Sequence, residues 1–591
     1  MTINANLKTH GLFAFAIGLG GLAIGLTPGC ARVAACESFD TCAVAGETGG
    51  DTGDDTGDDS GLPDLPEDTW DPPLSVNKDI DILFVIDNSG SMGEEQAILA
   101  SSLAPFIDVL EQPGIAANYR IGFTTTDNGN PWCPVGATTP ESGKLVLSSC
   151  KTRIGDFLFG DSVDVSDLAC NDICNLDAAD LEILPTTTDV DSQPKPRPWL
   201  ERIEGWKNIP DATGTAEAFA CFAPQGVNGC GFESPLESMY LALGRAQSTD
   251  EASFGFIRPH AILAVIFLTD EVDCSYNTDW ASIFDAEGNK EFWSDPMAGS
   301  PTSAICWNAG VECSGDPSSY ADCTSVNKDV NGNLDVADPE AVLHPVDRYI
   351  DLLEGIELQK QQLNDQQEVI VAVIGGVTSS GEPFYAEVGD SDPQFQANFG
   401  IGPGCVAPNP LDPNAPIRAV PPVRLRELSQ AFTPDNMFSI CEPDYTPALM
   451  EILNRIETQI QPACYSSCVE DTDPATEVVD PQCTLEQNPP GQGRLDIVPV
   501  SECLRDAKGY VIDVQTSTYA MPNAAANVCY AMLVDTGGQT ADPSDDISAV
   551  CSDDHGNLEF KLARRPGFPA IGGTQITADC VGAEVPEVTC G

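Results

Sequence analysis

Histidine and basic side chains are scarce in this sequence. It has four histidines, and 27 lysines and arginines against 91 aspartates and glutamates, for a formal net charge of -64. Such acidity argues against nucleic acid as a partner and against attraction to an anionic membrane surface. The scarcity of histidine removes the commonest catalytic base from most of the chain. The composition therefore favours solubility and the attraction of cations, although hydration of a secreted surface accounts for most of the acidity.

Several motifs of enzymes and zinc modules are missing as well. There is no GxSxG elbow, no HExxH and no phosphate-binding loop, so we expect no enzyme; hydrolysis by two carboxylates is the catalytic alternative. No CxxC occurs among 23 cysteines. The closest pairs, Cys170 with Cys174 and Cys464 with Cys468, have no histidine nearby, which favours disulfides over zinc. Disulfides in such number indicate an oxidising compartment.

The first thirty residues have the pattern of an export signal. Lys8 precedes an apolar stretch at 11–26, which is too short for a confident membrane span and predicts a signal peptide over 1–30. The ending Thr27-Pro-Gly-Cys30 resembles the lipobox of bacterial lipoproteins. This resemblance implies that Cys30 is lipidated and that a lipid anchor is the chain's contact with the membrane. We expect an outer-membrane, cell-surface lipoprotein, with a secreted or periplasmic protein as the alternative.

Residues 31–78 are dominated by glycine, aspartate and threonine, most clearly at 47–59. They offer too little apolar surface to fold, and their like charges favour an extended chain, so we expect a disordered tether. Calcium binding by the repeated aspartates is the less favoured alternative. Cys36 and Cys42 are expected to pair with each other.

The most informative stretch begins with five apolar residues, 82–86, which predict a strand buried on both faces. Asp87, Ser89 and Ser91 follow directly, and a helical period begins at Glu94. In open α/β sheets, ligands bind at the carboxyl ends of the strands. Carboxylate and hydroxyl oxygens suit Mg²⁺, Mn²⁺ or Ca²⁺.

These residues resemble the von Willebrand factor A (VWA) family, whose metal-ion-dependent adhesion site carries the motif DxSxS. The resemblance implies a metal held by Asp87, Ser89 and Ser91, by a threonine from a second loop and by an aspartate from a third. A carboxylate of the ligand fills the open coordination position. Asp270 ends a second apolar strand and matches the third loop. For the second loop we expect Thr215, with two alternatives, Thr213 or the carboxylate of Glu233.

The predicted fold class is α/β: a VWA-type (Rossmann-like), mostly parallel sheet flanked by helices over 79–461. Disulfide-stapled insertions are expected at about 127–206 and 274–344, with a short edge strand at 144–147 in the first. A helix is expected at 232–243. The segment 462–591 holds eight cysteines between short apolar pieces, which predicts a small β-rich, cystine-rich domain.

A second cation motif is weaker. Asp329 to Asp335, with Glu340 in the twelfth position, echoes an EF-hand loop but has Leu334 where that loop needs glycine. We interpret it as an Asn-Gly turn.

Together these patterns predict a cell-surface module for metal-dependent adhesion to a protein or matrix ligand that bears a carboxylate. Two alternatives stay open: a structural envelope lipoprotein with a degenerate metal site, and, less favoured, a hydrolase.

Overall fold

The computed structural model describes residues 78–590 with gaps at 113–114, 116, 134–137, 139, 160–162, 204, 363–366, 409–415, 460–462, 466, 474, 477, 489–497, 507–508, 514–517, 536–538, 541–543, 549–550, 552–556, 566–574 and 584–589. The predicted signal peptide, Cys30, the tether with Cys36 and Cys42, and His555 lie outside the described residues.

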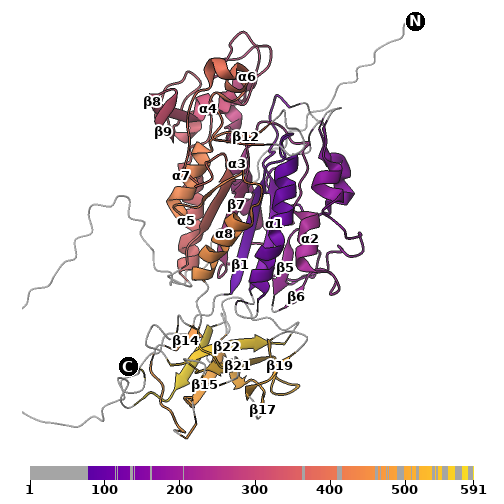
Figure 1. Cartoon of the computed structure of the whole chain (residues 1–591), viewed down its shortest axis with the longest axis vertical. Coiled ribbons are helices and arrows are strands. Elements are labelled where there is room, and N and C mark those ends of the chain that lie inside the picture. Colours follow the sequence, from indigo (N-terminus) through magenta and orange to yellow (C-terminus); the bar gives the residue numbers. More distant parts are fainter. Residues whose placement is uncertain are drawn as a thin grey trace, which may run out of the picture. The chain divides into compact units, whose positions relative to one another are not determined.

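A seven-stranded sheet forms the centre of the α/β part (Figure 1), in the order β13-β10-β7-β1-β2-β5-β6. The first five strands in this order are mutually parallel. β5 pairs with β2 in the antiparallel direction, and β6 pairs with β5 in the antiparallel direction, so the mostly parallel sheet is confirmed. The strands are β1 (Asp79–Ile86), β2 (Asn118–Thr125), β5 (Leu200–Ile203), β6 (Trp206–Lys207), β7 (Ile262–Leu268), β10 (Ile370–Gly375) and β13 (Met437–Ser439).

The predicted edge strand at 144–147 is wrong. The neighbour of β2 is β5, which lies inside the segment predicted to be an insertion. Val146 only donates one 2.8 Å backbone hydrogen bond to the Phe123 carbonyl. A short apolar run does not specify its strand partner, and here β5 takes that position on β2.

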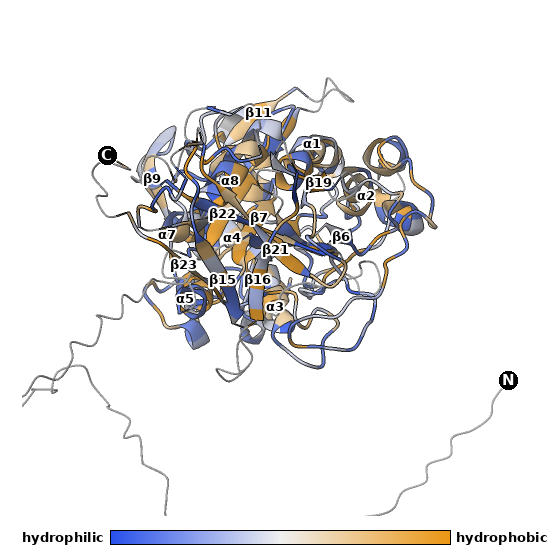
Figure 2. Cartoon of the chain, turned by 90° about the horizontal axis from the view of Figure 1, so that it is seen from below, coloured by the Kyte–Doolittle hydropathy of each residue, from blue (hydrophilic) through white to orange (hydrophobic). Residues whose placement is uncertain are grey.

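Helices cover both faces of the sheet, as predicted. Alternate β1 side chains, Ile82 and Phe84 among them, pack with α1, α2 and α8, whereas Leu83 and Val85 pack with α3, α5 and α7. In Figure 2 the strand β7 is coloured hydrophobic, whereas much of α5 is hydrophilic. The helices are α1 (Gly93–Glu111), α2 (Thr215–Phe222), α3 (Pro235–Ala246), α5 (Asp347–Gln361), α7 (Val423–Phe432) and α8 (Thr446–Gln459).

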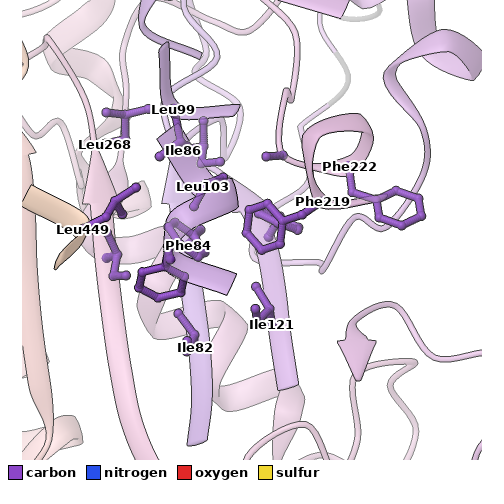
Figure 3. Close-up of a cluster of buried hydrophobic side chains, with 14 of the residues drawn as sticks. Ile82, Phe84, Ile86, Leu99, Leu103, Ile121, Phe219, Phe222, Leu268 and Leu449 are labelled. Atoms are coloured by element: carbon purple, nitrogen blue, oxygen red, sulfur yellow. The ribbon is translucent and has the colours of Figure 1, made fainter. Parts of the chain in front are cut away.

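The apolar side chains that recur along one face of α1 form the contact between this helix and the sheet. Leu99, Leu103, Phe106 and Leu110 recur at three- and four-residue spacing and are all buried. Figure 3 shows Leu99 and Leu103 of α1 near Ile86 and Phe84 of β1, with Phe219 of α2 to one side. This packing fixes the start of α1 against the end of β1, where the DxSxS-like loop lies.

The inserted segments contain short elements held by disulfides. The first includes the hairpin of β3 (Leu158–Phe159) and β4 (Val163–Asp164), and the second includes α4 (Ala304–Gly310), β8 (Val311–Asp316) and β9 (Ser319–Ser325). A third hairpin, β11 (Cys405–Ala407) with β12 (Ile417–Ala419), precedes α7, and α6 (Pro393–Phe399) precedes β11. The EF-hand-like segment is a turn, because Asp329 Oδ1 accepts the backbone N–H groups of Asn331 and Asn333.

The C-terminal segment is β-rich, as predicted. It forms a six-stranded sheet in the order β14-β22-β21-β16-β15-β23 and two small two-stranded sheets. The strands are β14 (Ala463–Cys464), β15 (Cys483–Asn488), β16 (Val498–Glu502), β17 (Arg505–Asp506), β18 (Gly509–Tyr510), β19 (Ile512–Asp513), β20 (Thr518–Tyr519), β21 (Val528–Leu533), β22 (Glu559–Arg564) and β23 (Gln575–Cys580).

Ten disulfides pair every cysteine from Cys133 onward, which confirms the preference for disulfides over zinc. Cystines in this number belong to a secreted or surface protein. None of the helices in the described part of the chain has the length and hydropathy needed to span a bilayer.

Candidate metal centre

Asp87 and Asp270 lie at the carboxyl ends of adjacent parallel strands. Ile86, the last residue of β1, pairs with Leu268, the last residue of β7. The Asp87 N–H donates a 2.9 Å hydrogen bond to the Leu268 carbonyl, which fixes the start of the loop. Because parallel strands end at one edge of a sheet, the two aspartates meet where ligands bind in open α/β folds.

Two donors orient the buried Asp87 carboxylate. The Ser89 N–H donates to Oδ1 at 2.8 Å, and the Thr269 hydroxyl donates to Oδ2 at 2.6 Å. A carboxylate has about four lone-pair sites, so at least one remains open beside the contacts from Ser89 and Thr269. Asp87 can therefore bind a cation without losing the contacts that hold it.

The serine hydroxyls of the same loop link the two aspartates. Ser89 Oγ and Ser91 Oγ are 3.1 Å apart, and the Ser91 side chain hydrogen-bonds the Asp270 carboxylate. Ser89 is buried and Ser91 is exposed. The structure thus brings together four of the residues singled out from the sequence, Asp87, Ser89, Ser91 and Asp270.

Thr215 does not join them, and the sequence-based preference for it is wrong. Thr215 begins α2, and its side chain lies beside that of Tyr119 near the start of β2. Tyr119 pairs with Ile80, near the start of β1. Asp87 follows Ile80 by seven residues along that strand, so at 3.3 Å per residue it lies about 20 Å from Ile80. The chain reaches the carboxyl edge only after traversing α2. Thr213 is no substitute, because its hydroxyl donates to the Asp180 carbonyl.

Glu233, the remaining alternative from the sequence, lies near Asp87. It lies before α3, which begins at Pro235 rather than at residue 232 as predicted, because proline suits the first turn of a helix. The Thr126 hydroxyl donates to Glu233 Oε2, and the Ser234 N–H donates to the Thr126 carbonyl at 2.9 Å. Glu233 is 1% exposed, and its Oε1 has no hydrogen-bond partner in the structure. Of the sequence alternatives for the second loop, the structure places the carboxylate near Asp87.

Three further carboxylates surround the site and were missed from the sequence. Glu95, in the first turn of α1, is 2% exposed, and its Oε2 has no hydrogen-bond partner. Glu271 follows Asp270 directly, and its Oε2 is likewise without a partner. Asp127, just after β2, is also buried. Their sequence positions beside the strand ends were a usable signal, but their burial depends on the inserted segments.

Disulfides hold the loops that carry these carboxylates. The bond Cys133–Cys230 ties the loop after β2 to the loop before α3, and the Cys230 N–H donates to Asp127 Oδ2 at 3.2 Å. In the second insertion, the Ser303 hydroxyl donates to the Gly231 carbonyl, in the loop before α3, at 3.0 Å. The insertions therefore reach the carboxyl edge of the sheet.

This negative charge has no basic counterpart. Among the described residues, none of the ion pairs formed by lysine, arginine or histidine involves Asp87, Glu95, Asp127, Glu233, Asp270 or Glu271. Burial, and then the charge of Asp87, raise the pKa of Asp270 to about 8. Burial also raises the pKa of Asp87, against the opposing hydrogen bonds from Thr269 and Ser89. A bound cation would supply the missing positive charge.

The donor set fits a hard divalent cation. Asp270 is 6% exposed and its Oδ1 has no hydrogen-bond partner, which is costly for a buried carboxylate unless an ion accepts its electron pair. Asp87 and Asp270 offer carboxylates, and Ser89 and Ser91 offer hydroxyls. The Glu233 carboxylate lies near Asp87, but among the described residues these three carboxylates do not all come within 4.8 Å of one another. Such all-oxygen donors suit Mg²⁺, Mn²⁺ or Ca²⁺.

Another acidic group lies in the C-terminal segment. One carboxylate oxygen each of Asp535, Asp545 and Asp546 lies within 4.8 Å of the others. Asp535 accepts the backbone N–H groups of Gln539 and Thr540 at 2.9 and 2.7 Å, so it has a structural role in this turn.

The two histidines in the described part of the chain lie outside the candidate metal centre. His260 pairs with Asp79 at 3.0 Å, at the start of β1, and His344 Nδ1 lies 2.9 Å from Asp338. Both contact a local aspartate rather than the candidate metal centre.

The sequence matches no protein-family model and no curated protein. Among solved structures, similarity is found to the pilus adhesin SpaC from Lactobacillus rhamnosus GG in its open conformation, with a TM-score of 0.25 and 10% identity over 87% of this chain and 53% of that one. A second crystal structure of the adhesin gives a TM-score of 0.24 and 10% identity over 86% and 54%. The chain thus spans about half the length of these adhesin structures, and a likeness this distant assigns neither fold nor function.

Proposed function

We propose that this chain is an exported binding protein whose VWA-type domain presents a divalent cation to a carboxylate of a protein or matrix ligand. The cation is Mg²⁺, Mn²⁺ or Ca²⁺, held by Asp87, Ser89, Ser91 and Asp270 with Glu233 beside them. The observation that carries the proposal is the pair of buried aspartates at two strand ends, linked by serine hydroxyls and without an ion pair to a basic side chain among the described residues.

The open position for the ligand follows from the donors. Ser91 is exposed while Asp87 and Ser89 are buried, so a cation on this loop faces solvent on the Ser91 side. An incompletely coordinated divalent cation attracts an anionic oxygen. A carboxylate of a partner protein is the commonest such donor outside the cell.

Calorimetry on the exported chain tests the metal. We expect Mn²⁺ or Mg²⁺ to bind the parent and not Asp87→Asn, which keeps the shape of the side chain. Asp316→Asn removes an exposed carboxylate in the β8–β9 turn and is the matched control, with unchanged binding. Absence of binding in a folded parent would refute the proposal.

A structural role for the cation is the second candidate. The crowding of Glu95, Glu233 and Glu271 around the two aspartates favours it, because buried like charges destabilise the fold until they are neutralised. Addition of a chelator separates the two functions. Loss of ligand binding with an intact fold supports the adhesive role, and unfolding supports the structural one.

For localisation we propose a lipid anchor on Cys30, with the acidic tether as a spacer. Mass spectrometry of the mature N-terminus would show a diacylglyceryl group on Cys30 if this is correct, and a free thiol or a disulfide otherwise.

A further inference from the structure

An exposed aromatic ring lies directly on the loop that carries Ser89 and Ser91. Phe159, in the β3–β4 hairpin of the first insertion, packs so closely on Gly90 that a Cβ at this glycine would be 2.8 Å from Phe159 Cδ1. Only glycine leaves room for the ring between the two serines. Yet Phe159 is 45% exposed, so much of its apolar surface faces solvent beside the candidate metal centre.

The hairpin that presents Phe159 is firmly anchored. The Val165 N–H donates to the Phe157 carbonyl at 3.0 Å, and a Cβ at Gly93 would lie 2.8 Å from Val165 Cγ1. At its base, Val227 N–H donates to the Asp156 carbonyl at 2.7 Å. The ring is therefore held beside the loop by contacts on both flanks of the hairpin.

The surroundings explain why apolar surface is useful there. With a formal net charge of -64, the chain repels anionic partners at long range. In the part of the chain that the structure describes, the carboxylates at the site have no basic neighbours in ion-pair contact. Beside the cation and hydrogen bonds, burial of apolar area is a source of attraction that this negative charge does not weaken.

We propose that Phe159 determines ligand specificity: it selects protein segments in which the metal-binding Asp or Glu is accompanied by an apolar side chain that packs on the ring. This inference rests on the proposed metal-dependent binding and adds the second chemical feature of the partner. The cation coordinates the carboxylate of the partner, and the neighbouring apolar side chain of the partner packs on the Phe159 ring.

Two small carboxylates test it on the Mn²⁺-loaded exported chain. Acetate offers only the carboxylate, and 3-phenylpropionate adds an aromatic group two carbons away. We expect 3-phenylpropionate to bind on the order of tenfold more tightly, the effect of burying roughly 50 Å² of apolar surface. Broadening of the probe protons by bound Mn²⁺ measures both affinities and reports that the probe lies at the ion.

Variants of the hairpin locate the effect. Phe159→Ser should abolish the advantage of 3-phenylpropionate while leaving the affinities for Mn²⁺ and acetate unchanged. Leu158→Ser is the matched control, because Leu158 is also 45% exposed but precedes Phe159 in a strand where successive side chains alternate in direction. It should keep the advantage.

Each other outcome is decisive. Equal binding of the two probes to the parent, or an advantage that persists in Phe159→Ser, would overturn the role of Phe159 while the metal function stands. Failure of Mn²⁺ to bind would overturn both proposals. Binding of Mn²⁺ without either carboxylate would leave the metal as a structural ion and also overturn the inference.

Discussion

The Thr269 hydroxyl donates a 2.6 Å hydrogen bond to Asp87 Oδ2, and so connects the residues that directly follow the neighbouring strands β7 and β1. Thr269 precedes Asp270, so one short segment supplies a candidate ligand and also the group that orients the opposite one. Residues that hold a ligand in this way often affect metal affinity nearly as much as the ligands do.

Replacing Thr269 should therefore weaken metal binding without removing a ligand. We expect Thr269→Val to lower Mn²⁺ affinity by roughly 10- to 100-fold, because Asp87 loses the donor that fixes its carboxylate. Thr269→Ser keeps the hydroxyl and should bind almost normally. Calorimetry of both variants is the measurement, and equal affinities would show that the hydrogen bond does not orient Asp87 for metal.

Removing the Asp87 charge should have opposite effects with and without metal. Without metal, Asp87→Asn should melt at a higher temperature than the parent, since a buried charge near Asp270 is gone. With Mn²⁺ at a hundred times its dissociation constant, the parent should gain about 2.7 kcal/mol and the variant nothing. Thermal melts with and without Mn²⁺ measure this. If Mn²⁺ still raises the melting temperature of Asp87→Asn, the metal binds at a site that does not include Asp87.

Glu233 and Thr215 can be compared directly as the second-loop ligand. Glu233→Gln should reduce Mn²⁺ affinity at least tenfold, since it removes one of the carboxylates at the site. Thr215→Val should not change Mn²⁺ affinity, because Thr215 lies near the amino ends of the strands, away from Asp87. Calorimetry on both variants decides, and the reverse order of effects would contradict the arrangement described above.

Lys360 should make stability depend on alkaline pH. It is 1% exposed, its ammonium donates to the carbonyls of Arg258 and Ala261, and burial lowers its pKa to about 8, with Asp81, Asp79 and Arg258 nearby. The unfolded chain holds this proton more tightly, up to the ordinary pKa of about 10.4.

Folding stability should therefore rise as pH increases from about 8 to about 10.5, by up to about 3 kcal/mol from this group. Urea unfolding at pH 7.5 and 10.5, with disulfides intact, compares the parent with Lys360→Met. The free energy of unfolding of the parent, relative to that of Lys360→Met, should be larger at pH 10.5 than at pH 7.5. An unchanged difference would show that Lys360 keeps an ordinary pKa.

Arg258 should be among the most sensitive residues for folding. Its guanidinium pairs with Asp79 at 2.8 Å and with the fully buried Asp81 at 2.9 Å, at the start of β1. Arg258→Met leaves these carboxylates without their partner and should cost about 3–5 kcal/mol in urea unfolding. Arg505→Met breaks an exposed pair with Glu502 and should cost less than about 1 kcal/mol. Similar losses in both would refute the distinction.

Much of the α/β fold was predictable because its strands and helices are locally encoded. The apolar runs at 82–86 and 262–268 predicted β1 and β7, and the stripe at Leu99, Leu103 and Phe106 predicted α1. Since parallel strands end at one edge, the sequence also predicted that Asp87 and Asp270 would meet. Patterns of two and 3.6 residues need no knowledge of distant contacts.

The position of the insertions, in contrast, was decided only by tertiary structure. Glu233 rather than Thr215 lies at the site because the chain crosses the sheet along α2 first, and because Cys133–Cys230 ties the loop before α3 to the end of β2. Phe159 lies on Gly90 because a hairpin about seventy residues away folds back onto the loop. Such loop positions depend on disulfide pairing and side-chain packing between distant segments, and neither leaves a periodic signal in the sequence.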